Sequence, residues 1–158
     1  GEYAKQHDSP LGAGQDDTNS GGTERGVTEA MRATRYFLAV VGITYLCLAV
    51  WCSLQPEQTS QLVGFKLEPG SGQSEFLVVY GGLELGLAGI LLLPLIRPKQ
   101  LESSLLACLI VHACLVLFRS ASFFLYSGIQ PMTYRLAIGE WIILLVSAWL
   151  VWRSKATA

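Results

Sequence analysis

Residues 75–96 read EFLVVYGGLELGLAGILLLPLI, and this stretch decides the fold class. After Glu75 it holds one charged side chain, Glu84, within a length of apolar sequence that suits a helix crossing about 30 Å of hydrocarbon. A helix in the core of a water-soluble bundle would carry a polar stripe at helical period, and this run carries none. We therefore predict a transmembrane helix over residues 75–96.

Three other apolar runs have the same length and character. The connections before and after the third run are short and contain proline, which makes the flanking helices antiparallel neighbours. The longer connection after the first run contains an apolar segment, LVGFKL, that we expect to lie on the membrane surface. The sequence predicts an all-α integral membrane four-helix bundle over residues 35–153, with helices over 36–54, 75–96, 101–125 and 134–152.

The composition excludes several classes of protein. The chain has 158 residues, of which 51% are hydrophobic and 15% charged, and its net charge is −1. Soluble domains carry about 25% charged residues. A soluble enzyme and a nucleic-acid binder are therefore excluded. The four cysteines form no C-x-x-C pair, so we expect them to serve packing rather than redox or zinc chemistry.

Polar segments flank the predicted bundle. Residues 1–34 are rich in Gly, Asp, Ser, Thr and Gln, and cannot bury enough apolar surface to order themselves in water. We expect this extension to dock on a neighbouring subunit, with a short helix over about 23–31, and residues 154–158 to form a C-terminal tail. We interpret Gly1 as the start of a processed chain.

Basic residues predict the orientation. Eight of them lie in the extension, the second connection and the C-terminus, against three on the opposite side. Such a bias places both termini on the positive-inside face of the membrane. We expect a bacterial inner membrane, a mitochondrial inner membrane or a thylakoid membrane.

Charged and polar residues inside the spans form the candidate site. A charge at mid-bilayer costs about 2.5–3.5 kcal/mol on insertion scales, so such residues face the bundle and pair. We place Glu84, Arg119 and Glu140 in the outer half of the membrane and predict that Arg119 bridges one or both acids. One acid then remains in surplus unless it is neutral or Arg135 reaches in. The predicted intramembrane polar cluster is Tyr80, Glu84, His112, Arg119 and Glu140.

The polar cluster has three readings that the sequence leaves open: a lock between helices, a pocket or proton relay, and a contact with another subunit. His112 is the one histidine in the spans, which excludes haem ligation by two histidines of this chain. No catalytic motif, metal-ligand pattern or phosphate loop occurs, so we expect no enzymatic activity, cofactor or metal. Small residues of the second span predict close helix packing at Gly81, Gly82, Gly86 and Gly89.

Three motifs resemble one family of small membrane proteins. They are EFLVVYGGLELGLAG at residues 75–89, LFRSASF at 117–123 and GEW at 139–141. The pattern resembles the domain of unknown function numbered four-three-four-five, within the DoxX-like group. That resemblance implies a four-helix bundle with acids and an arginine inside, and no established activity. Some DoxX-like proteins are membrane partners of quinone-linked oxidoreductases.

We expect a non-catalytic accessory subunit of a larger respiratory or photosynthetic membrane complex, because the chain is small, lacks catalytic motifs and carries a polar extension. The first alternative is a membrane protein that binds a small ligand or protons in an outer-half polar cavity. The second is a DoxX-like membrane subunit of a quinone-linked oxidoreductase. The expected partners are other subunits and lipid, and no nucleic acid.

Overall fold

The computed structural model describes the backbone of residues 17–156 and the side chains of residues 26–154. Over this part the chain is helical, and four of its helical segments are long and apolar enough to span a membrane, which confirms the predicted all-α membrane fold. The elements are α1 (Asp17–Leu54), α2 (Pro56–Leu62), α3 (Ser71–Phe76), η1 (Leu77–Leu83), α4 (Glu84–Ile96), η2 (Pro98–Gln100), α5 (Leu101–Leu125) and α6 (Pro131–Ala156).

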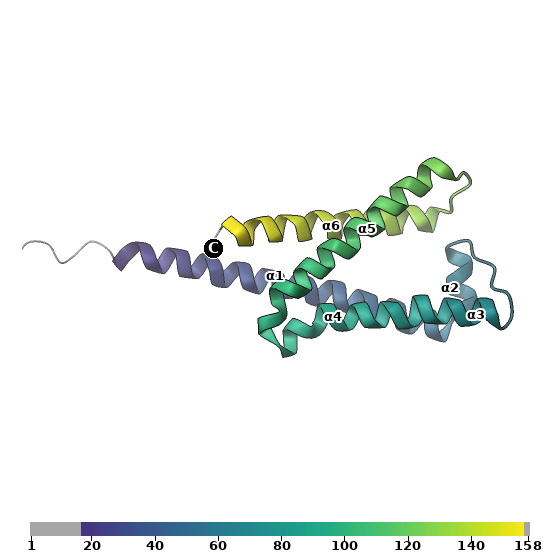
Figure 1. Ribbon diagram of the computed structural model, residues 1–158, viewed down its shortest axis with the longest axis horizontal. Coiled ribbons are helices and arrows are strands. Elements are labelled where there is room, and N and C mark those ends of the chain that lie inside the picture. The colour runs from purple at the N-terminus through teal and green to yellow at the C-terminus, as the bar shows by residue number, and fades with distance from the viewer. Residues whose placement is uncertain (1–16, 157–158) are drawn as a thin grey trace, which may run out of the picture.

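The four spans form two helix pairs. The second span is the continuous helix α3–η1–α4, which packs along α1, while α5 packs along α6 (Figure 1). The described ends of α1 and α6 that lead to the chain termini lie at the same end of the molecule, which we call the termini end. The opposite end carries the connections 55–70 and 126–130, and we call it the loop end. The two pairs diverge toward the loop end (Figure 1).

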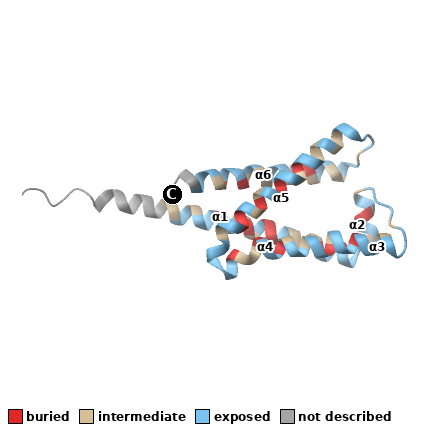
Figure 2. Ribbon diagram, viewed as in Figure 1, coloured by how far each residue is buried: buried red, intermediate tan, exposed pale blue. Residues whose placement is uncertain are grey.

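The core lies where the two pairs cross. Leu38, Leu91 and Cys108 are fully buried there, and Val41, Leu105 and Leu150 complete the cluster. Buried residues concentrate at this crossing in Figure 2, toward the termini end. The pairs are therefore joined by apolar packing at one end, which leaves room between them at the other.

Most of the apolar side chains of the spans face away from the core. In each of the four helical spans at most 28% of an 18-residue apolar window is buried within the chain, and large side chains such as Leu117 and Phe124 are exposed. In water such a surface would aggregate, but in a bilayer it contacts lipid tails at no cost.

A proline inside α4 is compensated by a serine from α5. Pro94 has no N–H, so it cannot donate to the carbonyl of Ile90 one helical turn earlier. The hydroxyl of Ser104 donates to that carbonyl across 2.8 Å. In hydrocarbon no water can replace the missing backbone donor, so the serine is needed to satisfy this carbonyl. Because the bond joins α4 to α5, it also holds the tight turn between them in place.

The boundaries of the flanking segments differ from the prediction. Residues 1–16 of the extension and residues 157–158 of the tail lie outside the described residues, and the expected short helix over 23–31 is part of α1. The predicted surface segment LVGFKL begins at Leu62, the last residue of the short helix α2, and turns at Gly64, which has a positive φ of 85°.

The bond across the α4–α5 turn yields a prediction. We expect Ser104→Ala to lower the free energy of unfolding by about 1–3 kcal/mol, because it leaves the Ile90 carbonyl without a donor in an apolar span. Denaturant unfolding of the purified protein in detergent measures the change.

The matched background is Pro94→Ala, which returns an N–H to the helix at the position that faces the Ile90 carbonyl. In the Pro94→Ala background, Ser104→Ala should lower the free energy of unfolding by much less. Equal losses in the two backgrounds would show that the serine does not substitute for the missing N–H.

Candidate functional site

A two-point ion pair links α5 to α6. Arg119 Nε donates to Glu140 Oε2 across 2.9 Å, and Arg119 Nη2 donates to Glu140 Oε1. The side chain of Arg119 is 26% exposed and that of Glu140 is 13% exposed, so the pair is largely shielded. The predicted bridge therefore forms with Glu140. No ion pair joins Arg119 to Glu84 within the part of the chain that the structure describes.

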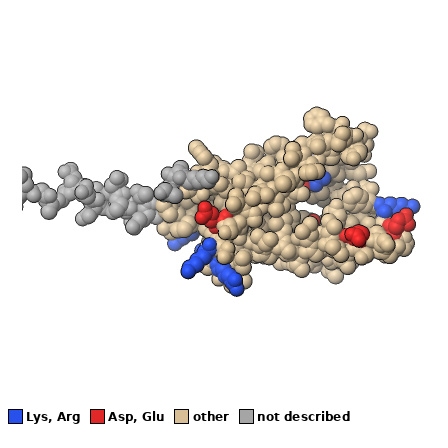
Figure 3. Space-filling view, viewed as in Figure 1, with Lys and Arg blue, Asp and Glu red and all other residues tan. Residues whose placement is uncertain are grey.

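Beside this ion pair lies a cavity of about 560 Å³ at the loop end. Its walls come from both helix pairs: the segment after α2 and η1 on one side, and α5, the connection 126–130 and α6 on the other. In Figure 3 the surface is hollowed between the two pairs, with basic and acidic atoms at the edge of the hollow. The lining residues are Val63, Gly64, Phe65, Tyr80, Arg119, Ser122, Tyr126, Ser127, Gly128, Ile129, Gln130, Thr133 and Leu136.

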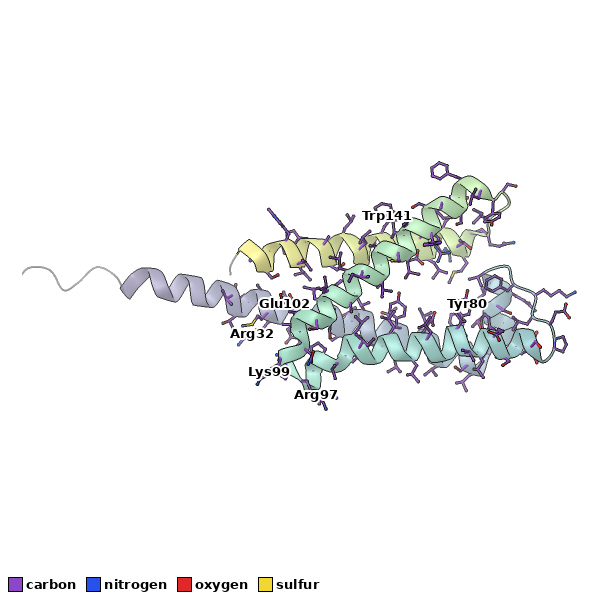
Figure 4. The ribbon with its side chains drawn as sticks, in the orientation of Figure 1. Arg32, Tyr80, Arg97, Lys99, Glu102 and Trp141 are labelled. Carbon is purple, nitrogen blue, oxygen red and sulfur yellow. The ribbon has the colours of Figure 1, made fainter. Side chains whose placement is uncertain are left out.

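Tyr80 is held at the cavity wall by two phenylalanines. Its ring stacks on Phe76 with a centroid separation of 4.5 Å and meets the edge of Phe65 at 6.0 Å. Figure 4 shows Tyr80 near the loop end, beside α2. Its hydroxyl has no hydrogen-bond partner among the described residues, so it remains available to a molecule in the cavity.

Glu84 stands apart from the ion pair and from the cavity lining. It lies near the middle of the span Ser71–Ile96, which begins four residues earlier than predicted. Its Oε2 atom is buried and has no hydrogen-bond partner among the described residues. A buried carboxylate without a partner is among the most expensive groups a protein can hold.

His112 is fully buried and joins α1 to α5. Its Nδ1 lies 2.8 Å from the Cys108 carbonyl oxygen, which can only accept, so Nδ1 carries the hydrogen. The neutral ring then accepts at Nε2 from the Tyr45 hydroxyl, 3.1 Å away. Both ring nitrogens are thus satisfied within the chain, as expected for a histidine inside a bundle. Tyr45 is a partner that the sequence analysis did not identify.

Of the four glycines predicted to pack, one makes a close contact within this chain. A Cβ added at Gly81 would lie 2.6 Å from Ser53 Oγ on α1, whereas Gly82, Gly86 and Gly89 have nothing within 4 Å of that position. The three face outward from the helix pair. Gly81 lies within η1, a π-helical segment, and such segments are often found at functional sites.

The structure brings together two of the five predicted site residues at the cavity, Tyr80 and Arg119, with Glu140 directly behind the arginine. The sequence analysis did not predict the neutral polar residues that line the cavity. Ser122 lies three residues after Arg119 and Thr133 lies seven before Glu140, so both fall on the same helix faces as the charged residues. That spacing is the signal that could have identified them.

Within residues 26–154, no three His, Cys, Asp or Glu side chains lie close enough together to share a metal ion. The four cysteines, all within this range, are free thiols.

Comparison with known proteins finds no family model, no curated protein and no solved structure that matches the chain. The resemblance to the DoxX-like group therefore stays a prediction.

The ion pair yields a stability prediction. We expect Arg119→Leu to lower the free energy of unfolding by about 3–5 kcal/mol, because Glu140 would keep a shielded charge without its partner. Unfolding in detergent, followed by circular dichroism, measures the loss.

The control is the double variant Arg119→Leu/Glu140→Leu, which leaves no orphaned charge and should recover most of the stability. A single variant that is as stable as the unmodified protein would show that the pair does not hold α5 against α6.

Proposed function

We propose that this membrane protein binds a small molecule in the cavity between its two helix pairs. The observation that carries the proposal is the cavity itself, whose volume of about 560 Å³ falls within the range of about 300–1,000 Å³ typical of small-molecule sites. Its lining is about half polar and half apolar, so both the polar and the apolar parts of a small molecule would find partners there. This corresponds to the first alternative expected from the sequence.

The energetics of the cluster also favour binding over a purely structural role. A lock between helices needs only the Arg119–Glu140 pair, yet Tyr80, Gln130 and Thr133 present further polar groups to the same cavity. Their side chains make no hydrogen bond with other described side chains. Tyr80 and Thr133 are partly shielded and belong to spans, where a polar group that satisfies nothing internally is best explained by something that it contacts.

A bound molecule is directly testable. We expect the purified protein to carry a small molecule that native mass spectrometry detects, and we expect Ser122→Trp, which fills the cavity from α5, to lose it. The matched control is Leu117→Trp, on an exposed position of the same helix that does not line the cavity. Retention of the same species by Ser122→Trp, with both variants folded, would contradict the proposal.

A second candidate is the accessory subunit, and the length of α1 favours it. Its 38 residues extend about 57 Å, well beyond a hydrocarbon core of about 30 Å. The part before Gly26 precedes the span and extends past the neighbouring helices at the termini end (Figure 1). A helix that leaves the membrane alone offers a docking element for a neighbouring subunit of a respiratory or photosynthetic complex.

Deletion of residues 1–25 tests this candidate. We expect the shortened chain to insert normally but to leave the large complex, as seen on a gentle-detergent native gel of source membranes. Migration of the shortened chain with an unchanged large complex would count against a docking role for the extension.

The orientation belongs to the same proposal. Arg32, Arg97 and Lys99 gather at the termini end (Figure 4). By the positive-inside rule that end faces the inner compartment of a bacterial inner membrane or of an organellar membrane. The loop end, where the cavity lies, then faces the opposite side.

A further inference from the structure

From the geometry of Arg119 we infer that the cavity binds the carboxylate head group of a single-chain amphiphile, which reaches it from the bilayer. The inference rests on the proposed binding function and names the class of ligand. Three observations carry it: the unused edge of the guanidinium, the charge of the lining, and the position of the cavity between diverging helix pairs.

The guanidinium of Arg119 has one edge occupied and one edge free. Glu140 takes one hydrogen from Nε and one from Nη2, along the side edge. The remaining hydrogens, on Nη1 and Nη2, have no acceptor among the described residues, and Arg119 lines the cavity. Of these three hydrogens, one on Nη1 and one on Nη2 form two parallel donors, a geometry that matches the two oxygens of a carboxylate.

Glu140 prepares this edge for a ligand. By holding Nε and Nη2 from behind, the acid fixes the plane of the guanidinium and removes the freedom that a ligand would otherwise have to restrict. Arg119 is the one charged residue of the lining, and its charge is already balanced by Glu140. Each negative charge of a ligand therefore adds to that of Glu140, so a singly charged head group is penalised less than a doubly charged one.

The surroundings favour an amphiphile over a soluble acid. Arg119 lies six residues before the end of α5, about 9 Å below the loop end at 1.5 Å per residue, and thus within the span. Figure 3 looks across the helices, along the plane of the membrane, and the hollow between the pairs is visible from that side. Leu136 on α6 gives the cavity an apolar wall within a span, and Phe65 and Ile129 line it at the loop end.

The test uses the full-length protein in detergent and native mass spectrometry with three probes: palmitate, hexadecanol and butyrate. Hexadecanol has the chain without the carboxylate, and butyrate has the carboxylate without the chain. We expect palmitate to bind with one molecule per chain. Hexadecanol should bind about tenfold more weakly or worse, since a charge-assisted hydrogen bond contributes about 1.5–3 kcal/mol. Butyrate should also bind at least about tenfold more weakly, because it lacks most of the chain whose burial favours binding.

The variant Arg119→Gln/Glu140→Gln removes the guanidinium without orphaning a charge, and its fold is checked by circular dichroism. It should lose palmitate binding by about tenfold or more. The matched control, Arg135→Gln, removes a positive charge near the same end of the membrane from a residue that does not line the cavity, and should keep palmitate binding.

Several results would overturn the inference. If hexadecanol bound as tightly as palmitate, the carboxylate head group would not contribute to binding. If butyrate bound as tightly, the ligand would be a water-soluble acid and not an amphiphile. Undiminished palmitate binding by the folded double variant would show that Arg119 is not the receptor.

Failure of this inference is distinguishable from failure of the proposed function. If palmitate does not bind but Ser122→Trp still removes a co-purified molecule, the ligand class is wrong and the cavity remains a binding site. If the unmodified protein carries no molecule and binds no probe, both are wrong.

Discussion

A hydrocarbon interior offers no water to hydrogen-bond the polar groups of a spanning helix, and the structure depends on how the chain meets this constraint. Pro94 leaves the Ile90 carbonyl without its helical donor, and Ser104 supplies one from the next helix. His112 binds a carbonyl through one nitrogen and the Tyr45 hydroxyl through the other. Each of these bonds joins two different turns or helices, so satisfying the polar groups also assembles the bundle.

The Arg119–Glu140 pair also satisfies polar groups within the spans, but it does not join the two helix pairs. It joins α5 to α6, which are already neighbours, and adds nothing across the gap between the two helix pairs. Apolar packing of Leu38, Leu91 and Cys108 joins the pairs near the termini end instead. Because the cross-pair contacts are concentrated at one end, the other end stays open, and the cavity is the direct result of that asymmetry.

The sequence was sufficient to predict the spans, because a run of about 20 apolar residues has few alternatives to a membrane helix. It also identified Arg119 and Glu140, since charges in such runs must pair. It did not determine that Glu140, rather than Glu84, is the partner, because that choice depends on how each helix is rotated about its axis. The π-helical segment η1, which lies just before Glu84, changes this rotation by a fraction of a turn that residue spacing does not encode. The contact between Tyr45 and His112 could not be predicted for a related reason. The position of a tyrosine in an apolar run does not indicate which polar residue its hydroxyl will contact.

Glu84 is the exception that argues most strongly for function. Arg119 and Glu140 pair with each other, and His112 is hydrogen-bonded to Tyr45 and Cys108. The buried Oε2 atom of Glu84, in contrast, has no hydrogen-bond partner among the described residues. A leucine or methionine at this position would avoid the desolvation cost and extend the apolar face of the helix, so the residue does not serve stability. Departures from local rules of this kind are expected where a protein gives up stability for activity. Glu84 begins α4 one turn beyond Tyr80, whose ring forms a wall of the cavity. The polar groups of this span therefore extend from Tyr80 at the cavity wall to Glu84 near the middle of the span, outside the cavity lining.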